Sequence, residues 1–197
     1  LNKASLAADC QVDVRTVDGW LSVLQASRVV RLLEPYSANV SKRLVKTPKI
    51  YFCDTGLVCG LLGIDDPATL AMHPQWGGIF ENAVVEEVEK RLLSYGQVPQ
   101  LSFWRDSNGL EADLVVEHGG RVARLVEIKA SATYNPRFFS GLARVGEALS
   151  VPPERRCVVY SGDASQQMPA GELLALADAH RLADPCAPTD SLPWSRG

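Results

Sequence analysis

The sequence predicts a mixed α/β (α+β) fold built from two consecutive units, and three observations support this prediction. The first 53 residues favour helix, helix, strand, loop and strand, in that order. From residue 77 onward the order becomes helix, three strands, helix, strand and helix. With 197 residues, 46% of them hydrophobic and 22% charged, the chain has the size and composition of one or two compact globular domains.

Residues 1–53 are predicted to form a winged-helix-like unit. A short helix is expected over residues 3–10, and Asp13 is placed to cap a second helix that extends to about Gln25. Apolar residues recur on one face of this second helix, at Val14, Val17, Leu21 and Leu24. The predicted strands are residues 29–33 and 49–53. This order is that of a winged helix-turn-helix, a unit that binds DNA in some proteins and serves for packing or protein docking in others.

The charge of the chain is unevenly distributed. Residues 1–52 carry a net charge of +4, and because the whole chain carries −3, the remainder carries −7. A basic unit on an acidic body predicts a local site for phosphate or for an acidic partner, with a solvated basic loop as the alternative. The candidate nucleic-acid contacts are Lys42, Arg43, Lys46, Lys49 and, farther along the chain, Arg105, for which an ion pair with Glu111 is the alternative.

Residues 54–76 are predicted to be a helical connector, in which Asp54 caps a helix that extends to Leu62. The unit that follows is expected to span residues 77–183. Its predicted helices are residues 79–94, 136–148 and 169–180, and its predicted strands are residues 100–105, 111–117, 122–130 and 156–161. Gly119 and Gly120 supply the positive φ angles that a tight hairpin needs. The tail at residues 184–197 contains three prolines and is expected to be irregular.

Glu81 is the most informative acid of the long predicted helix. At 100° per residue it lies on the same stripe as the apolar residues Val85, Val88 and Leu92. Glu86 and Lys90 fall on the opposite face, where an ordinary i,i+4 ion pair is expected. A carboxylate on the inward stripe is unfavourable unless it meets a cation, a metal ion or hydrogen-bond donors, so Glu81 is predicted to belong to a site.

Asp113, Glu127 and Lys129 are predicted to converge with Glu81. Glu127 and Lys129 are two positions apart in one strand and therefore share a face, and the hairpin brings the strand of Asp113 beside them. Carboxylate oxygens suit Mg²⁺ or Mn²⁺, which can activate a water and neutralise charge that develops on a phosphate. The pattern therefore favours a phosphodiester-hydrolysing site, whereas a neutralised, purely structural cluster is the alternative.

The order of these elements, with Glu on the helix and Asp…Glu-x-Lys on the strands, resembles the PD-(D/E)xK nuclease superfamily. The residues before Asp113 depart from its pattern, since Ala112 stands in place of proline. More narrowly, several segments resemble an uncharacterised C-terminal domain of predicted bacterial and archaeal AAA+ ATPases. These segments are Lys46–Leu57, Gly78–Asn82, Phe103–Asp106, Glu111–Asp113 and Glu127–Ser131. The resemblance implies a restriction-endonuclease-like αβββαβ domain with catalytic Glu81, Asp113, Glu127 and Lys129, and a metal bound by Glu81, Asp113, Glu127 and the backbone carbonyl of Ile128.

We therefore expect the C-terminal region of an AAA+ ATPase that cleaves DNA with Mg²⁺ or Mn²⁺. The chain contains no G-x-x-x-x-G-K-[ST], so ATP is expected on an upstream domain, and an oligomer is compatible with this assignment. One alternative is a catalytically inactive module that binds nucleic acid or docks the ATPase on a partner. A second alternative is a transcription regulator that acts through the winged helix.

The sequence also predicts a cytoplasmic protein without a membrane partner. No apolar run approaches the roughly 20 residues that cross a bilayer. The five cysteines are scattered without a C-x-x-C pair, which argues against structural zinc and favours mostly buried thiols in a reducing compartment. The first residues, Leu1-Asn2-Lys3, lack an initiator Met and a signal-peptide pattern, so a cut end is expected.

Overall fold

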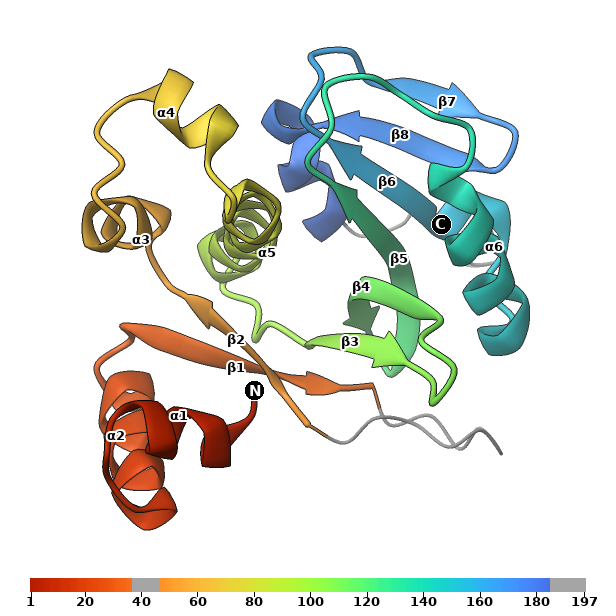
Figure 1. Cartoon of the computed structure of the whole chain (residues 1–197). Coiled ribbons are helices and arrows are strands. Elements are labelled where there is room, and N and C mark those ends of the chain that lie inside the picture. The colour runs from red at the N-terminus through yellow and green to blue at the C-terminus, as the bar shows by residue number, and fades with distance from the viewer. Residues whose placement is uncertain (37–46, 185–197) are drawn as a thin grey trace.

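The computed structural model of the chain describes residues 1–36 and 47–184 (Figure 1). Its strands form one mixed eight-stranded sheet in the order β2-β1-β3-β4-β5-β6-β8-β7, which confirms the α+β class for the described part of the chain. The strands are β1 (Val30–Pro35), β2 (Lys49–Phe52), β3 (Leu101–Arg105), β4 (Glu111–His118), β5 (Arg121–Lys129), β6 (Arg156–Tyr160), β7 (Gln166–Met168) and β8 (Gly171–Ala175). The helices are α1 (Lys3–Asp9), α2 (Val14–Ala26), α3 (Thr55–Leu61), α4 (Pro67–Met72), α5 (Trp76–Ser94), α6 (Phe138–Leu149) and the 3₁₀ segments η1 (Pro153–Arg155) and η2 (Leu176–Ala183).

The N-terminal helices begin where the sequence predicts. The Asp13 carboxylate accepts a hydrogen bond from the Thr16 N–H at 2.8 Å, which caps α2. Of the predicted apolar stripe, Val17 and Leu21 are buried, whereas Val14 and Leu24 are exposed. The connection between β1 and β2, with Lys42, Arg43 and Lys46, lies outside the described residues. The tail from residue 185 also lies outside them.

The N-terminal strands are part of the same sheet as the strands that follow α5. β1 pairs antiparallel with β2 and parallel with β3, where Glu34 lies opposite Ser102 and Pro35 opposite Phe103. Leu33 and Tyr51 are buried in the same apolar cluster as α5. The sheet is therefore continuous across the junction between the two predicted units.

Helices cover both faces of the sheet (Figure 1). On one face, α5 and η2 pack on side chains that include Leu114, Val116 and Val126. On the other face, α6 packs on Val115 and Leu125, as the alternation of side chains along β4 and β5 requires. No helix in residues 1–36 and 47–184 combines the length and the apolar composition that crossing a membrane demands.

Helix α5 is buried around most of its circumference, which corrects the prediction of one inward stripe. Glu86 and Glu89 are buried together with Val84, Val85 and Val88. The predicted Glu86–Lys90 ion pair forms, with 3.4 Å between Oε1 and Nζ, but the Glu86 side chain is 5% exposed. Burial raises the pKa of Glu86. The difference arises because α3 and the N-terminal strands cover the side of α5 that a two-layer arrangement would leave in solvent.

The predicted helix at residues 169–180 is wrong. The structure places β8 there, paired in parallel with β6, and then the 3₁₀ segment η2. Leu173 and Leu174 are fully buried on opposite faces of the sheet, and a Cβ at Gly171 would lie 2.3 Å from the Arg156 carbonyl oxygen. The alanine- and leucine-rich composition favours a helix, but pairing with β6 decides the outcome.

The cysteines differ in burial more than the sequence predicts. Cys157 is buried in the core, Cys53 and Cys59 are half-buried, and Cys10 is exposed. Cys186 lies outside the described residues. The assignment to a reducing cytoplasm stays a prediction.

Candidate active site

Asp113 and Glu127 lie on adjoining antiparallel strands at the point where the backbone pairing of β4 and β5 ends. The last paired residues in this direction are Leu114 and Val126, so Asp113 and Glu127 come next. There the Asp113 Oδ2 atom accepts a hydrogen bond from the Ile128 N–H at 2.8 Å, in place of a backbone carbonyl. The local chain geometry therefore fixes the Asp113 carboxylate against β5.

Lys129 forms an ion pair with Glu127 through Nζ and Oε1. The two residues are two positions apart in β5, and their contact confirms that they share a face, as the strand spacing predicts. The Lys129 side chain is 38% exposed and that of Glu127 14% exposed. The pair thus extends from the buried part of the site toward solvent.

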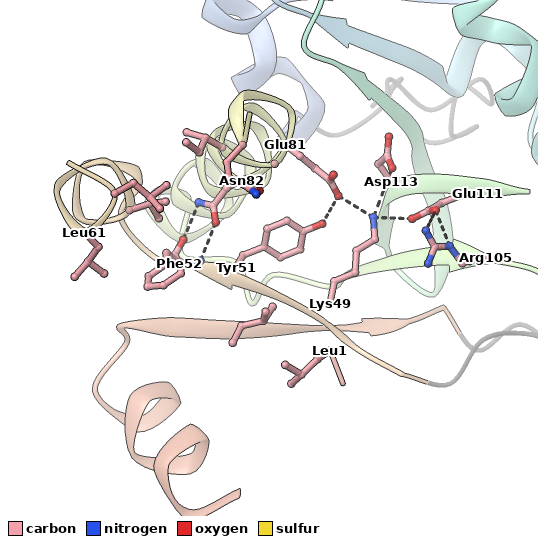
Figure 2. A pocket seen from close by; sticks show the side chains of 16 residues that line it. Leu1, Lys49, Tyr51, Phe52, Leu61, Glu81, Asn82, Arg105, Glu111 and Asp113 are labelled. Carbon is pink, nitrogen blue, oxygen red and sulfur yellow. Dashed lines mark hydrogen bonds and ion pairs between the residues drawn. The ribbon is translucent and has the colours of Figure 1, made fainter. Parts of the chain in front are cut away.

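Glu81 reaches the site from the first half of α5. Its Oε1 atom accepts hydrogen bonds from the Lys49 Nζ at 2.7 Å and from the Tyr51 hydroxyl at 2.5 Å (Figure 2). Burial and the charge of Glu81 both raise the pKa of Tyr51, so the phenol stays protonated and donates this bond. Glu81 is therefore held from the side of β2, by two residues that alternate along that strand.

Lys49 lies at the centre of a cluster of carboxylates formed by Glu81, Glu111 and Asp113. Its ammonium lies 2.6 Å from Glu111 Oε1 and 3.5 Å from Asp113 Oδ1, in addition to the bond to Glu81 (Figure 2). It also lies 5.4 Å from the centroid of the Phe103 ring. The sequence placed Lys49 among the candidate nucleic-acid contacts, whereas in the structure its side chain points into the group of carboxylates.

Arg105 pairs with Glu111 at the rim of the cluster. The Arg105 Nε–Glu111 Oε2 distance is 2.6 Å, and a second guanidinium nitrogen contacts the same oxygen. This ion pair was the predicted alternative to a phosphate contact. With a side chain 45% exposed, Arg105 remains accessible from solvent.

The carboxylates of the site are only partly compensated. Burial, followed by the charges of Glu127 and Glu81, raises the pKa of Asp113 to about 7. Burial also raises the pKa of Glu127, against the opposing effect of Lys129. Burial alone would lower the pKa of Lys49, but the negative charges of Glu81 and Asp113 outweigh it and raise that pKa. The cluster therefore favours the binding of additional positive charge.

The chemistry of the donor set fits Mg²⁺ or Mn²⁺, because hard carboxylate oxygens suit both ions. The carboxylates of Asp113 and Glu127 are on adjoining strands. The Ile128 carbonyl leaves β5 on the same side as the N–H that contacts Asp113. In the described part of the chain, however, no group of three or more Asp, Glu, His or Cys side chains is already arranged as a metal centre. The ammonium of Lys49 stands among the acids instead.

A cavity of about 730 Å³ adjoins the cluster. Lys49, Glu81, Glu111 and Asp113 line its polar part, and Leu61 and Leu62 line an apolar part (Figure 2). Glu127 and Lys129 are not among its lining residues. The cavity thus gives access to the acids from the side of β2 and α3.

Sequence reasoning did not assign Lys49, Tyr51 and Asn82 to the cluster or its support. The Asn82 side-chain amide pairs with Phe52 of β2, accepting from its N–H at 2.8 Å and donating to its carbonyl at 2.9 Å. The alternation of Lys49 and Tyr51 was a usable signal, since it places both side chains on one face of a strand. What the sequence lacked was the position of α5 opposite that face.

The fold and the cluster define an α+β protein in which a helix and adjoining strands hold a group of carboxylates and lysines. The chain belongs to the family described as Domain of unknown function (DUF4143), whose model matches residues 76–178. Residues 1–68 match the model of a second family, Domain of unknown function (DUF8612). The N-terminal match contains Lys49 and Tyr51, so the cluster draws residues from both matched regions.

Two curated mycobacterial proteins are similar to the chain. They are the uncharacterized protein Mb2031c of Mycobacterium bovis and the uncharacterized protein Rv2008c of Mycobacterium tuberculosis. Each is 34% identical over 186 residues, which cover 91% of this chain and 40% of the relative. The chain therefore spans less than half the length of these relatives. No solved structure matches it significantly.

Proposed function

We propose that this chain carries a Mg²⁺- or Mn²⁺-dependent phosphodiesterase site that cleaves DNA, with Glu81, Asp113, Glu127 and Lys129 as its catalytic residues. The observation that carries the proposal is the meeting of Asp113 and Glu127 on adjoining strands, with Lys129 on Glu127. Glu81 approaches the same group from α5, and its charge contributes to the raised pKa of Asp113. A helix acid, two strand acids and a lysine in this order are also what the resemblance to PD-(D/E)xK nucleases implies.

Each of these side chains has a defined task in the proposed reaction. Asp113, Glu127 and the Ile128 carbonyl would hold the divalent cation, and Glu81 would complete its environment from the helix. The cation supplies an activated water and neutralises charge on the phosphate when it is bound. The Lys129 ammonium has three donor hydrogens and donates to one oxygen of Glu127. A remaining hydrogen can therefore orient the attacking water.

The larger protein is proposed to be an AAA+ ATPase, with ATP bound outside this chain. The motifs that resemble C-terminal domains of such ATPases support this, and the greater length of the mycobacterial relatives leaves room for a further domain. DNA and the ATPase domain are accordingly the proposed partners. An oligomer is compatible with this proposal.

A catalytically inactive binding or docking module is the second candidate, and one observation favours it. Lys49 and Lys129 both lie against the carboxylates, and such pairing neutralises acids without any metal. In that case the cluster would stabilise the junction of α5 with β2, β4 and β5. The two candidates differ in whether a divalent cation and Lys129 matter for catalysis.

A cleavage assay separates the candidates. Linear and circular DNA are incubated with the protein in EDTA, Mg²⁺ or Mn²⁺, and the Lys129→Met variant is compared with Lys90→Met. Lys90 serves as the control because its ammonium pairs with Glu86 and Glu87 of α5 and contacts none of the proposed catalytic residues. We expect cation-dependent cleavage that falls by about 10²–10³-fold in Lys129→Met, the range for loss of one transition-state donor. Lys90→Met should retain full activity. No cleavage with either cation would favour the docking module, and full activity of Lys129→Met would exclude the role given to that residue.

A further inference from the structure

We propose that Lys49 is an internal counter-ion of this site, whose ammonium a divalent cation must displace in order to bind. The inference rests on the proposed metal-dependent function and adds a control on metal loading. Lys49 comes from β2, in the region that matches the N-terminal family, whereas the acids come from α5 and β4. Metal loading would therefore depend on where the N-terminal strands hold this one side chain.

Carboxylate oxygens surround the Lys49 ammonium, as they would surround a bound metal cation. It has carboxylate oxygens of Glu81 and Glu111 at 2.7 and 2.6 Å, and a third from Asp113 at 3.5 Å. Glu81 and Asp113, two of the acids that contact this ammonium, are also proposed ligands of Mg²⁺, which binds oxygen at about 2.0–2.1 Å. The ammonium and a divalent cation cannot both lie against these two carboxylates, because repulsion between the two positive charges in a partly buried site is strong.

The surroundings allow Lys49 to leave while the acids stay in place. The Tyr51 hydroxyl holds Glu81 at 2.5 Å and the Ile128 N–H holds Asp113 at 2.8 Å, and neither bond involves Lys49. Lys49 also lines the 730 Å³ cavity, which offers room for its four-carbon side chain to swing outward. Lys129 differs, since it contacts one carboxylate and is already 38% exposed, compared with 21% for Lys49.

The primary test measures Mn²⁺ affinity by calorimetry on protein stripped of metal. Lys49→Met keeps the length of the side chain and removes the charge, and Lys90→Met is the matched control. We expect Lys49→Met to bind Mn²⁺ about tenfold more tightly than the wild type or more, because no ion pairs must be broken first. The control should bind like the wild type. Equal or weaker binding by Lys49→Met would overturn the proposal for Lys49 and leave the metal-dependent function standing.

A second measurement uses the wild type alone and covers the case in which Lys49→Met does not fold. Amine acetylation at Lys49 is followed by mass spectrometry with EDTA and with Mg²⁺, and Lys3, paired with Asp18 on the surface, is the internal reference. Displacement predicts that Mg²⁺ raises the rate at Lys49 severalfold and leaves Lys3 unchanged. An unchanged rate in protein that binds Mg²⁺ would overturn the displacement. Absence of any Mn²⁺ or Mg²⁺ binding would overturn the proposed function and this inference together.

Discussion

Asp113 is the residue at which burial and like charge act together. Its side chain is 15% exposed, and burial with the charges of Glu127 and Glu81 raises its pKa from 3.8 to about 7. Between about pH 4 and 7 the folded protein therefore keeps a proton that the unfolded chain releases. The folded state binds more protons in this window, so the contribution of Asp113 to stability falls as the pH rises through it.

Asp113→Asn should remove this pH dependence. The amide oxygen can still accept from the Ile128 N–H, but no carboxylate forms. In EDTA we expect the variant to gain stability relative to the wild type between pH 5 and pH 8, by roughly 1–3 kcal/mol. Urea unfolding of both proteins at the two pH values measures the difference. Parallel pH profiles of the two proteins would mean that ionisation of Asp113 does not destabilise the metal-free protein.

Among the predicted site residues, those whose placement follows from local chain geometry could be brought together from the sequence alone. Glu127 and Lys129 share a face because strand side chains alternate, and the hairpin at Gly119-Gly120 is sufficient to bring Asp113 beside them. Lys49 could not be placed in this way. Its partners lie at least 32 positions away along the chain, and their approach depends on how α5 packs against β2. Whether any of these residues is catalytic stays a prediction.

Helix α5 is the element that joins the N-terminal strands to the rest of the protein. Asn82 pairs with both backbone polar groups of Phe52, and Glu89 binds Arg31 of β1 at 2.8 Å. Both α5 residues are buried. Two adjacent residues of α5 therefore have different partners. Glu81 contacts Lys49 and Tyr51 in the site, and Asn82 binds the backbone of β2 at the edge of the sheet.

Replacement of Asn82 by alanine should loosen this junction. Two hydrogen bonds are lost and the Phe52 backbone is left without its partner, so we expect a loss of about 1–3 kcal/mol in the free energy of unfolding. Asn108→Ala, at an exposed turn, is the control and should change stability by less than about 0.5 kcal/mol. Chemical denaturation of the three proteins gives the comparison, and equal stability of Asn82→Ala and the control would contradict the role of this amide.

Element prediction succeeded where local signals and tertiary packing agree and failed where they conflict. Asp13 and Asp54 each cap the helix that the sequence assigns to them. The helix α4, capped by Asp66 within the predicted connector, was missed because it has only six residues. The segment Gly171–Ala175 has a helix-favouring composition, but its place beside β6 is set by contacts with residues far away in the sequence.

At the scale of the molecule, the strands of the described residues form one continuous sheet to which both matched regions contribute. β1 and β3 pair in parallel, and Leu33 and Tyr51 are buried in the apolar cluster around α5. Residues that match two family models thus share one core. The boundary predicted at residue 53 separates two successive sets of elements along the chain. In the structure these two sets share one sheet and one apolar core.

A fragment of residues 76–184 should therefore be much less stable than the chain of 197 residues. It would expose the edge of β3 and leave Glu81, Asn82 and Glu89 without their partners in residues 28–52. We expect its melting temperature to fall by more than about 10 °C, or its cooperative transition to disappear, since several buried contacts are lost at once. Differential scanning calorimetry tests this, and addition of residues 1–75 in trans should restore part of the transition. A fragment that melts like the whole chain would show that the two regions fold independently.

The hydrogen bonds of Asn82 have a further consequence at the margin of the sheet. An open sheet ends in two strands whose outer backbone groups can template a strand from another molecule. At the β2 margin, Asn82 already occupies both polar groups of Phe52, and at the opposite margin β7 is only three residues long. In the part of the chain that the structure describes, neither margin offers a long run of free backbone groups. An amide that fastens a helix to a strand thereby also occupies backbone groups that an added strand from another molecule would need.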